Sequence, residues 1–374
     1  MSKKTIAAVV VVLVVVVVLI IAALSSTPDE PEETPTRGET IPADAVKMTP
    51  GTDLMPPLLH SNEWLQPVPM PGPINTAGAE DSPFVMPDGN TMFFFFTPDV
   101  SVPAEKQLLD KVTGIWWSKR VAGNWSEPER IMLSDDLALD GAEFVQGSKM
   151  WFASVRVGNY GEIDIYTAAL VDGEWTEVEN AGTQLNVDYN IGEFTITPDG
   201  QTLYFHSGNW SDGESMDIWR SEKVTGGWGE PVRVTEVNSA RWEGWPFVTP
   251  DSSELWFTGE SRLGFTGPAL FRSEKVGDGW GEPVEIVSQF AGEPTLDSEG
   301  NLYFVHHYFD ADMNMIEADI YVAYRNVTRA ADMAEAGAEG SEPTPAISEI
   351  SDILTVSRDI TVWTLTTRDT ACWA

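Results

Sequence analysis

Short apolar runs separated by turn-forming residues set the pattern of this chain between residues 192 and 232. The four runs lie at residues 193–197, 201–207, 217–221 and 228–232. Pro198-Asp199-Gly200 stands between the first two runs, and Gly226-Gly227 precedes the last. Asp-Gly pairs tolerate the positive φ angles that tight hairpins need. The stretch therefore predicts four short antiparallel strands joined by turns.

Three features of this stretch recur at a period of about fifty residues, which indicates a repeat architecture. A tryptophan followed three residues later by Pro or Val marks an outer strand, at Trp64, Trp125, Trp175, Trp228 and Trp280. An inner strand opens at each of Ser82, Glu143, Glu193, Trp245 and Glu293. A third strand is centred near each of Trp116, Tyr166, Trp219, Phe271 and Tyr321.

The order of these markers predicts how the two ends of the repeat region meet. Trp64 precedes the first inner strand, whereas no such tryptophan follows the last third strand at residues 320–324. We therefore expect the segment around Trp64 to pair with Ile320–Tyr324 and to supply the missing outer strand, which removes exposed sheet edges. The prediction is an all-β fold, a five-bladed β-propeller spanning residues 62–326 and closed by an N-terminal outer strand.

The turn sequences resemble those of a known repeat. Pro87-Asp88-Gly89, Pro198-Asp199-Gly200 and Pro250-Asp251-Ser252 are each followed by an apolar, aromatic run and then by Asp-Ile-Tyr/Trp or a related triplet. This pattern looks like the TolB-type, WD-like β-propeller repeat. The resemblance implies a propeller but says little about function, because such propellers serve both as binding scaffolds and as parts of enzymes.

The N-terminal 61 residues have a different composition from the repeats. Lys3-Lys4 precedes an uncharged run from Thr5 to Ser26, which has about the twenty-residue length of a membrane-spanning helix. We predict that residues 1–26 form an uncleaved signal anchor, with a cleaved signal peptide as the alternative. Both place the rest of the chain outside the cytoplasm, at the cell surface or in the periplasm. Residues 27–61, rich in Pro, Thr and Glu, are expected to form an extended stalk.

Composition excludes some classes of partner. The formal net charge of −36 argues against nucleic-acid binding, which requires clustered Lys and Arg. A single cysteine, Cys372, excludes an internal disulfide framework. Residues 327–374 lack the repeat pattern and are predicted to be an acidic, low-complexity tail.

Chain direction assigns the loops to the two ends of the predicted propeller. We call the end at which the inner strands begin the top. The long, variable loops all fall at the top, and such loops on a rigid scaffold usually carry binding. Because the outer strand at Trp64 runs from bottom to top, we expect the stalk to enter at the bottom and the top to face away from the membrane.

The top also gathers acidic side chains. Glu143, Glu193 and Glu293 stand at the same register before their inner strands, and Asp81 and Glu243 lie close to that register. In one interpretation these acids are a repeated structural latch that accepts hydrogen bonds from neighbouring loops. In the other, Glu143, Glu193 and Glu293 hold a hard cation such as Ca²⁺.

These observations favour a binding or interaction module for a protein or glycan ligand. The expected ligand-binding face comprises Asp81, Glu143, Glu193, His206, Trp210, Glu243, Trp245, Glu293, His306 and His307. The alternative is a carbohydrate-active hydrolase that uses carboxylates at the channel mouth. Its candidate catalytic residues are Glu143, Glu193, Glu243 and Glu293. Asn124, Asn209 and Asn326 fit the N-glycosylation sequon.

Overall fold

The computed structural model describes residues 35–107, 109–134, 138–208 and 216–327. The predicted anchor, Asn209, Trp210 and the tail from residue 328 onward lie outside the described residues. The described helices are short: α2 (Arg37–Thr40), α3 (Ala104–Gln107) and the single π-helical turn η1 (Gln184–Tyr189). Among the described residues, none of these helices has the length and apolarity that a membrane crossing requires.

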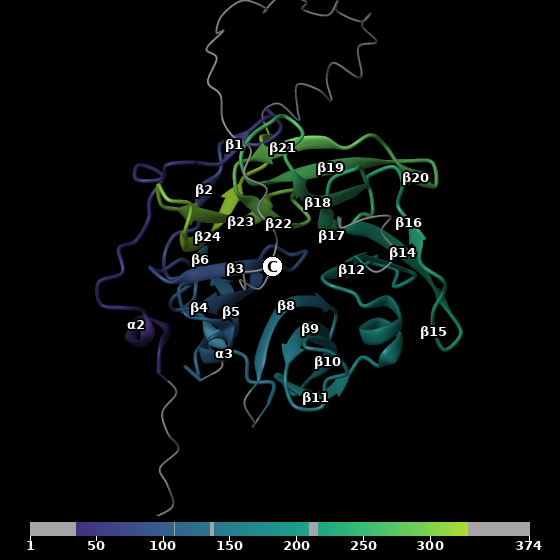
Figure 1. The fold of residues 1–374 in the computed structure, drawn as a ribbon, viewed down its shortest axis with the longest axis horizontal. Coiled ribbons are helices and arrows are strands. Elements are labelled where there is room, and N and C mark those ends of the chain that lie inside the picture. Colours follow the sequence, from purple (N-terminus) through teal and green to yellow (C-terminus); the bar gives the residue numbers. More distant parts are fainter. Residues whose placement is uncertain (1–34, 108, 135–137, 209–215, 328–374) are drawn as a thin grey trace, which may run out of the picture. The chain divides into compact units, whose positions relative to one another are not determined.

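The strands of the described chain form four hydrogen-bonded sheets, which we divide in chain order into five antiparallel sets (Figure 1). Sets 1 and 5 belong to one nine-stranded sheet, in which β24 and β3 make a parallel contact. Set 1 comprises β3 (Ala79–Val85), β4 (Thr91–Thr97), β5 (Gly114–Val121), β6 (Asn124–Trp125) and β7 (Glu129–Arg130). Set 2 comprises β8 (Leu139–Gln146), β9 (Lys149–Val155), β10 (Asp164–Val171) and β11 (Glu174–Asn180). Set 3 comprises β12 (Phe194–Ile196), β13 (Thr202–Ser207), β14 (Asp217–Val224), β15 (Gly227–Trp228) and β16 (Val232–Arg233).

The remaining sets complete the ring of sheets. Set 4 comprises β17 (Glu243–Val248), β18 (Glu254–Glu260), β19 (Pro268–Val276), β20 (Gly279–Trp280) and β21 (Val284–Ser288). Set 5 comprises β22 (Ala291–Leu296), β23 (Leu302–Phe309) and β24 (Met315–Ala323). The first strand of each set faces a common centre, which is the arrangement of a β-propeller (Figure 1).

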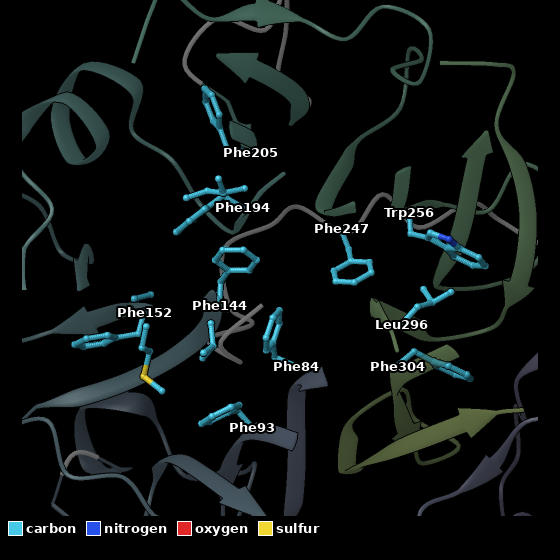
Figure 2. Close-up of a cluster of buried hydrophobic side chains, with 14 of the residues drawn as sticks. Phe84, Phe93, Phe144, Phe152, Phe194, Phe205, Phe247, Trp256, Leu296 and Phe304 are labelled. Carbon is cyan, nitrogen blue, oxygen red and sulfur yellow. The ribbon is translucent and has the colours of Figure 1, made fainter. Parts of the chain in front are cut away.

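Aromatic side chains from the inner strands fill the centre of the ring. Phe84, Phe144, Phe194 and Phe247 converge from four different sets (Figure 2). The ring centroids of Phe84 and Phe144 are 5.3 Å apart in an edge-to-face arrangement. Such contacts add to the large apolar area that each ring buries. The middle of the ring is therefore a packed core rather than an open pore.

The predicted pairing of the two ends of the ring is present. β2 (Val68–Pro69) runs antiparallel to β24, with Val68 opposite Val322, and Trp64 forms a bridge with Arg325. The Trp64 indole is buried, lies edge-on to Trp256 and donates a hydrogen bond to the Gly300 carbonyl at 2.9 Å. The outer strand of set 5 therefore comes from the N-terminal side of the chain.

The predicted extended stalk is wrong for residues 37–61, which we call the N-terminal strap. The strap packs on the sheets: Arg37 is buried, and β1 (Leu58–Leu59) pairs with β21. The Arg37 guanidinium donates hydrogen bonds to Glu80 at 3.1 Å and to the Ile74 carbonyl at 2.9 Å. Because Glu80 lies at the top of set 1, the strap begins at the top and not at the bottom, and the predicted orientation of the top face no longer follows.

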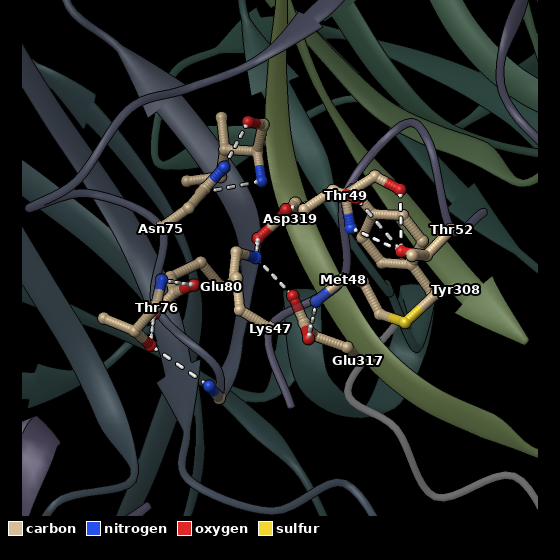
Figure 3. A network of polar contacts seen from close by, with 12 residues as sticks. Lys47, Met48, Thr49, Thr52, Asn75, Thr76, Glu80, Tyr308, Glu317 and Asp319 are labelled. Carbon is tan, nitrogen blue, oxygen red and sulfur yellow. Dashed lines mark hydrogen bonds and ion pairs between the residues drawn. The ribbon is translucent and has the colours of Figure 1, made fainter. Parts of the chain in front are cut away.

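A lysine of the strap joins it to set 5. The Lys47 ammonium forms ion pairs with Glu317 and Asp319 at the top of β24, and the backbone N–H of Met48 also donates to Glu317 at 2.9 Å (Figure 3). Both carboxylates are buried, so they depend on this partner. Charged residues here fix a segment whose sequence has no apolar periodicity.

A recurring asparagine, which the sequence analysis did not identify, ties three of the incoming segments to the neighbouring third strand. The Asn186 side chain accepts from the backbone N–H of Ile165 at 2.7 Å and donates to its carbonyl at 3.1 Å. Asn75 and Asn238 make the same paired contacts with Ile320 and Ile218. Each amide extends the sheet by one pair of hydrogen bonds and satisfies buried backbone groups.

Replacing Lys47 with Met should lower the free energy of unfolding by about 3 kcal/mol, because two buried carboxylates then lose their cation. Lys106→Met, at an exposed position of α3, should change it by less than about 0.5 kcal/mol. Urea unfolding of both purified variants at pH 8 measures the difference. Equal stabilities for the two variants would show that the strap does not contribute to the fold.

Candidate functional site

The inner strands carry a β-bulge where they reach the top of the ring. Pairing shifts between Gly141 and Phe144, and between Gly244 and Phe247, as it does in β3 and β22. One residue in each bulge has a positive φ, including Trp245 at 49° and Glu293 at 55°. Side chains of this size rarely adopt that conformation, which costs on the order of 1–3 kcal/mol. Bulges of this kind re-aim side chains and are frequent beside functional sites.

The bulges correct the predicted register of the acids. Glu293 occupies the positive-φ position of its bulge, as Trp245 does in β17, whereas Glu143 stands one residue after the positive-φ residue Ala142. The three glutamates are therefore not equivalent by register. They nevertheless line one cavity of about 40 Å³, formed by the tops of the five inner strands.

Burial raises the pKa of every glutamate at this cavity. The pKa of Glu193 rises to about 8, because burial and the nearby Asp81 outweigh a hydrogen bond from Trp245. Burial raises the pKa values of Glu143 and Glu293 well above their ordinary value, and the neighbouring acids add to the effect. Near neutral pH the Glu193 side chain is therefore largely protonated, and burial favours the protonated forms of Glu143 and Glu293 as well.

Trp245 and His206 position Glu193. The Trp245 indole N–H donates to Glu193 at 3.0 Å, and the indole packs against the His206 ring at a centroid distance of 5.0 Å. The backbone N–H groups of Glu193 and Trp245 lie 3.2 and 3.0 Å from the two His206 ring nitrogens. A neutral imidazole has one accepting nitrogen, so one of these contacts is a hydrogen bond. Burial lowers the pKa of His206 to about 3, so the ring is neutral.

The other two predicted histidines have different surroundings. His307 Nε2 lies 3.4 Å from a carboxylate oxygen of Asp81, beside the cavity. His306 is fully buried, and its Nε2 is 2.9 Å from Asp53 of the strap. The prediction that His306 belongs to an exposed face is therefore wrong, because the strap covers it.

Glu243 does not belong to the cavity. It accepts hydrogen bonds from the backbone and side chain of Ser239 and from Arg262, the last at 2.9 Å. Glu80 has matching contacts with Thr76 and Arg37. The latch interpretation describes these two acids, and it removes Glu243 from the candidate catalytic residues.

The calcium hypothesis is not supported by the geometry. Among the described residues, no group of three or more His, Cys, Asp or Glu side chains is placed to hold a metal ion.

Sequence reasoning missed the strap residues that pair with buried groups at the top of the ring, namely Arg37, Lys47 and Asp53. Isolated charges in a Pro- and Thr-rich segment gave no signal of their partners. Of the sequon residues, Asn124 is exposed in the turn that carries β6, and the backbone N–H of Asn326 donates to the Glu63 carbonyl at 2.8 Å. Trp210 and Asn209 lie outside the described residues.

Comparisons with known proteins add limited information. No protein-family model and no curated protein matches the sequence. TolB from Acinetobacter baumannii has a TM-score of 0.42 and 15% identity over 67% of this chain and 55% of its own, so the match spans about half of that protein. The α-L-arabinofuranosidase from Podospora anserina, solved with cellotriose, has a TM-score of 0.41 and 12% identity over 66% and 91% of the two chains. The β-propeller domain of the Trilobed protease from Pyrococcus furiosus has a TM-score of 0.31 and 10% identity over 67% and 72%. These values say nothing about what the chain binds.

The raised pKa values predict a stability that falls as pH rises. The folded protein keeps a proton on Glu193 at pH values at which the unfolded chain has released it, so the free energy of unfolding falls as pH rises from ~4.5 to about 8. Burial of Glu143 acts in the same direction. Glu193→Gln keeps the acceptor for Trp245 and carries no charge. The melting temperature of Glu193→Gln, relative to that of the native protein, should therefore be higher at pH 9 than at pH 6.

Glu243→Gln is the matched control for this measurement. It breaks an ion pair with Arg262 and should lower the melting temperature by a similar amount at both pH values. If the native protein and Glu193→Gln keep a constant difference from pH 6 to pH 9, Glu193 has an ordinary pKa.

Proposed function

We propose that this protein is an extracytoplasmic, five-bladed β-propeller that acts as a binding module through the centre of its top face. The strand sets are its blades, and the segment at Trp64 and β2 closes the ring. The TolB-type repeat pattern at Pro198-Asp199-Gly200 is part of this proposal. Gly200 lies in a turn, and its backbone N–H donates a hydrogen bond to the Thr197 carbonyl at 2.7 Å.

The observation that carries the proposal is the group of strained, buried residues around the central cavity. Trp245 and Glu293 hold positive φ angles, and Glu143 is buried without a hydrogen-bond partner on either carboxyl oxygen. A residue with a strained backbone, or a buried polar side chain without a hydrogen-bond partner, lowers the stability of the fold. Such residues are usually kept because they serve another role, such as binding. The packed aromatic rings beneath give these residues a rigid base.

The size of the cavity favours binding over carbohydrate hydrolysis. Pockets that hold a small organic ligand are roughly 300–1,000 Å³, whereas this cavity measures about 40 Å³. It has no space for a sugar ring between two carboxyl groups, which glycoside hydrolysis requires. A partner would instead cover the mouth and reach in with a small group.

Loops around the mouth provide contact area for such a partner. Each of the long top loops in sets 1, 2, 4 and 5 exposes large apolar side chains. They are Leu109, Val157, Tyr160, Ile163, Leu263 and Met313. Exposed apolar side chains beside a polar centre are typical of protein interaction sites.

We also propose that residues 5–26 anchor the protein in a membrane. The uncharged length of this segment supports the proposal. Membrane retention through a carbonate wash, with Met1 or Ser2 still present, would agree with it. A mature chain that begins after Ala23 would contradict it.

A photo-crosslinking amino acid placed at Leu263 should give discrete adducts when the protein is expressed in its own cells, because Leu263 is exposed on a top loop of set 4. The same amino acid at Val276 is the control, since Val276 is equally exposed at the bottom turn of the same set. Mass spectrometry of the adducts distinguishes a protein from a glycan partner. Adducts at Val276 alone would contradict binding at the top face, and hydrolysis of chromogenic glycosides that Glu143→Gln abolishes would support the enzyme instead.

A further inference from the structure

The central cavity contains carboxyl oxygens that have no partner among the described residues. Both oxygens of Glu143 and one of Glu293 are in this state, and the two residues are 5% and 6% exposed. Both side chains line the cavity. Buried acceptors normally find a donor, so an arrangement of this kind indicates a ligand that brings donors with it.

The geometry of the cavity limits what that ligand can be. A volume of about 40 Å³ is enough for roughly three water molecules. The carboxyl groups reach it from three different sets, with Glu143 on β8, Glu193 before β12 and Glu293 on β22. The rest of the wall consists of aromatic, proline and alanine side chains, including Phe84, Pro83 and Trp245, together with the hydroxyl-bearing Ser82, Thr195 and Thr295. The site is therefore small, largely apolar at its sides and lined by carboxyl groups from several directions.

Three classes of small group are disfavoured by these features. Anions are disfavoured because the ionised forms of the clustered acids would repel them, and a metal ion lacks a suitable group of ligands among the described residues. A guanidinium group is flat and matches one carboxylate through two parallel hydrogen bonds. A primary ammonium group fits better, because its three N–H donors diverge toward separate acceptors. An alkyl stem suits the largely apolar wall, to which Trp245 contributes.

We propose that the central cavity binds the primary ammonium group at the end of an alkyl chain, with Glu143, Glu193 and Glu293 as its acceptors. The group belongs to a lysine side chain of a partner or to a free alkylamine. This inference rests on the proposed binding function and names the chemistry that the mouth recognises. It assigns Trp245 a second role, since its indole holds Glu193 in place beside the ligand.

Binding of a cation at this site is coupled to release of protons. The acids hold protons when the cavity is empty, and an ammonium charge beside them favours their ionised forms. Binding should therefore tighten as pH rises toward 9. The other titratable groups that face the cluster are Asp81 of β3, His206 of β13 and His307 of β23.

Calorimetric titration of the full-length protein with n-butylammonium tests the inference, with n-butanol as the uncharged probe of the same shape. We expect binding of n-butylammonium only, with an affinity at least ten times higher at pH 8.5 than at pH 6. Glu143→Gln and Glu193→Gln should each weaken it at least tenfold. Glu299→Gln, in an exposed turn at the bottom of set 5, makes the same charge change away from the cavity and should bind as the native protein does.

A second pair of probes distinguishes the source of the ammonium group. A short acetylated peptide with one lysine is compared with the same peptide containing norleucine. Binding of the lysine peptide identifies a macromolecular partner, and binding of n-butylammonium alone identifies a small amine; both support the inference. Equal response to n-butylammonium and n-butanol, or unchanged affinity in folded Glu143→Gln, overturns it. If partner adducts still form at Leu263 in that case, the proposed binding function is supported although the ammonium inference is wrong.

Discussion

A carboxyl group that leaves water must either meet a cation or keep its proton, and this constraint organises the top of the propeller. Some buried acids there are paired with arginine, as Asp140 is with Arg156 at 2.6 Å and Glu243 with Arg262 at 2.9 Å. The acids at the central cavity have no such partner, and their pKa values are raised. The paired acids hold the loops in place, whereas the unpaired acids remain available to a ligand.

In sets 1 and 5 the cations that pair with buried acids come from the N-terminal strap and not from the repeat strands. Arg156 and Arg262 lie one and two residues after the second strands of sets 2 and 4. Each lies over an aromatic ring of its own set, as Arg262 does over Phe271 at 4.7 Å. In set 1 the equivalent guanidinium comes from Arg37 of the strap, 5.2 Å from the Phe96 ring. Lys47 has a related role in set 5. The strap therefore contributes to the fold through charge and not through apolar periodicity.

The sequence predicted those features that depend on periodic apolar positions and on turn residues. The order of the tryptophan markers predicted the pairing of β2 with β24, and chain direction predicted that Glu143, Glu193 and Glu293 would lie at one end of the ring. Contacts made by single charged residues over long separations carry no periodic signal, so Arg37 and Lys47 were missed. The bulges shift the register by one residue, and they are marked in the sequence only by single residues, such as the preceding Gly244 and Gly292 and the following Pro246 and Pro294.

Infrared difference spectroscopy of the protonated carboxyl band tests most directly whether the central acids are neutral. At pH 7 solvent-exposed carboxylates are ionised, so a band at this pH reports buried acids. The account predicts a band at pH 7 that weakens in both Glu143→Gln and Glu193→Gln and is unchanged in Glu299→Gln. A native protein without this band at pH 7 would show that the central acids are ionised, and it would contradict the account.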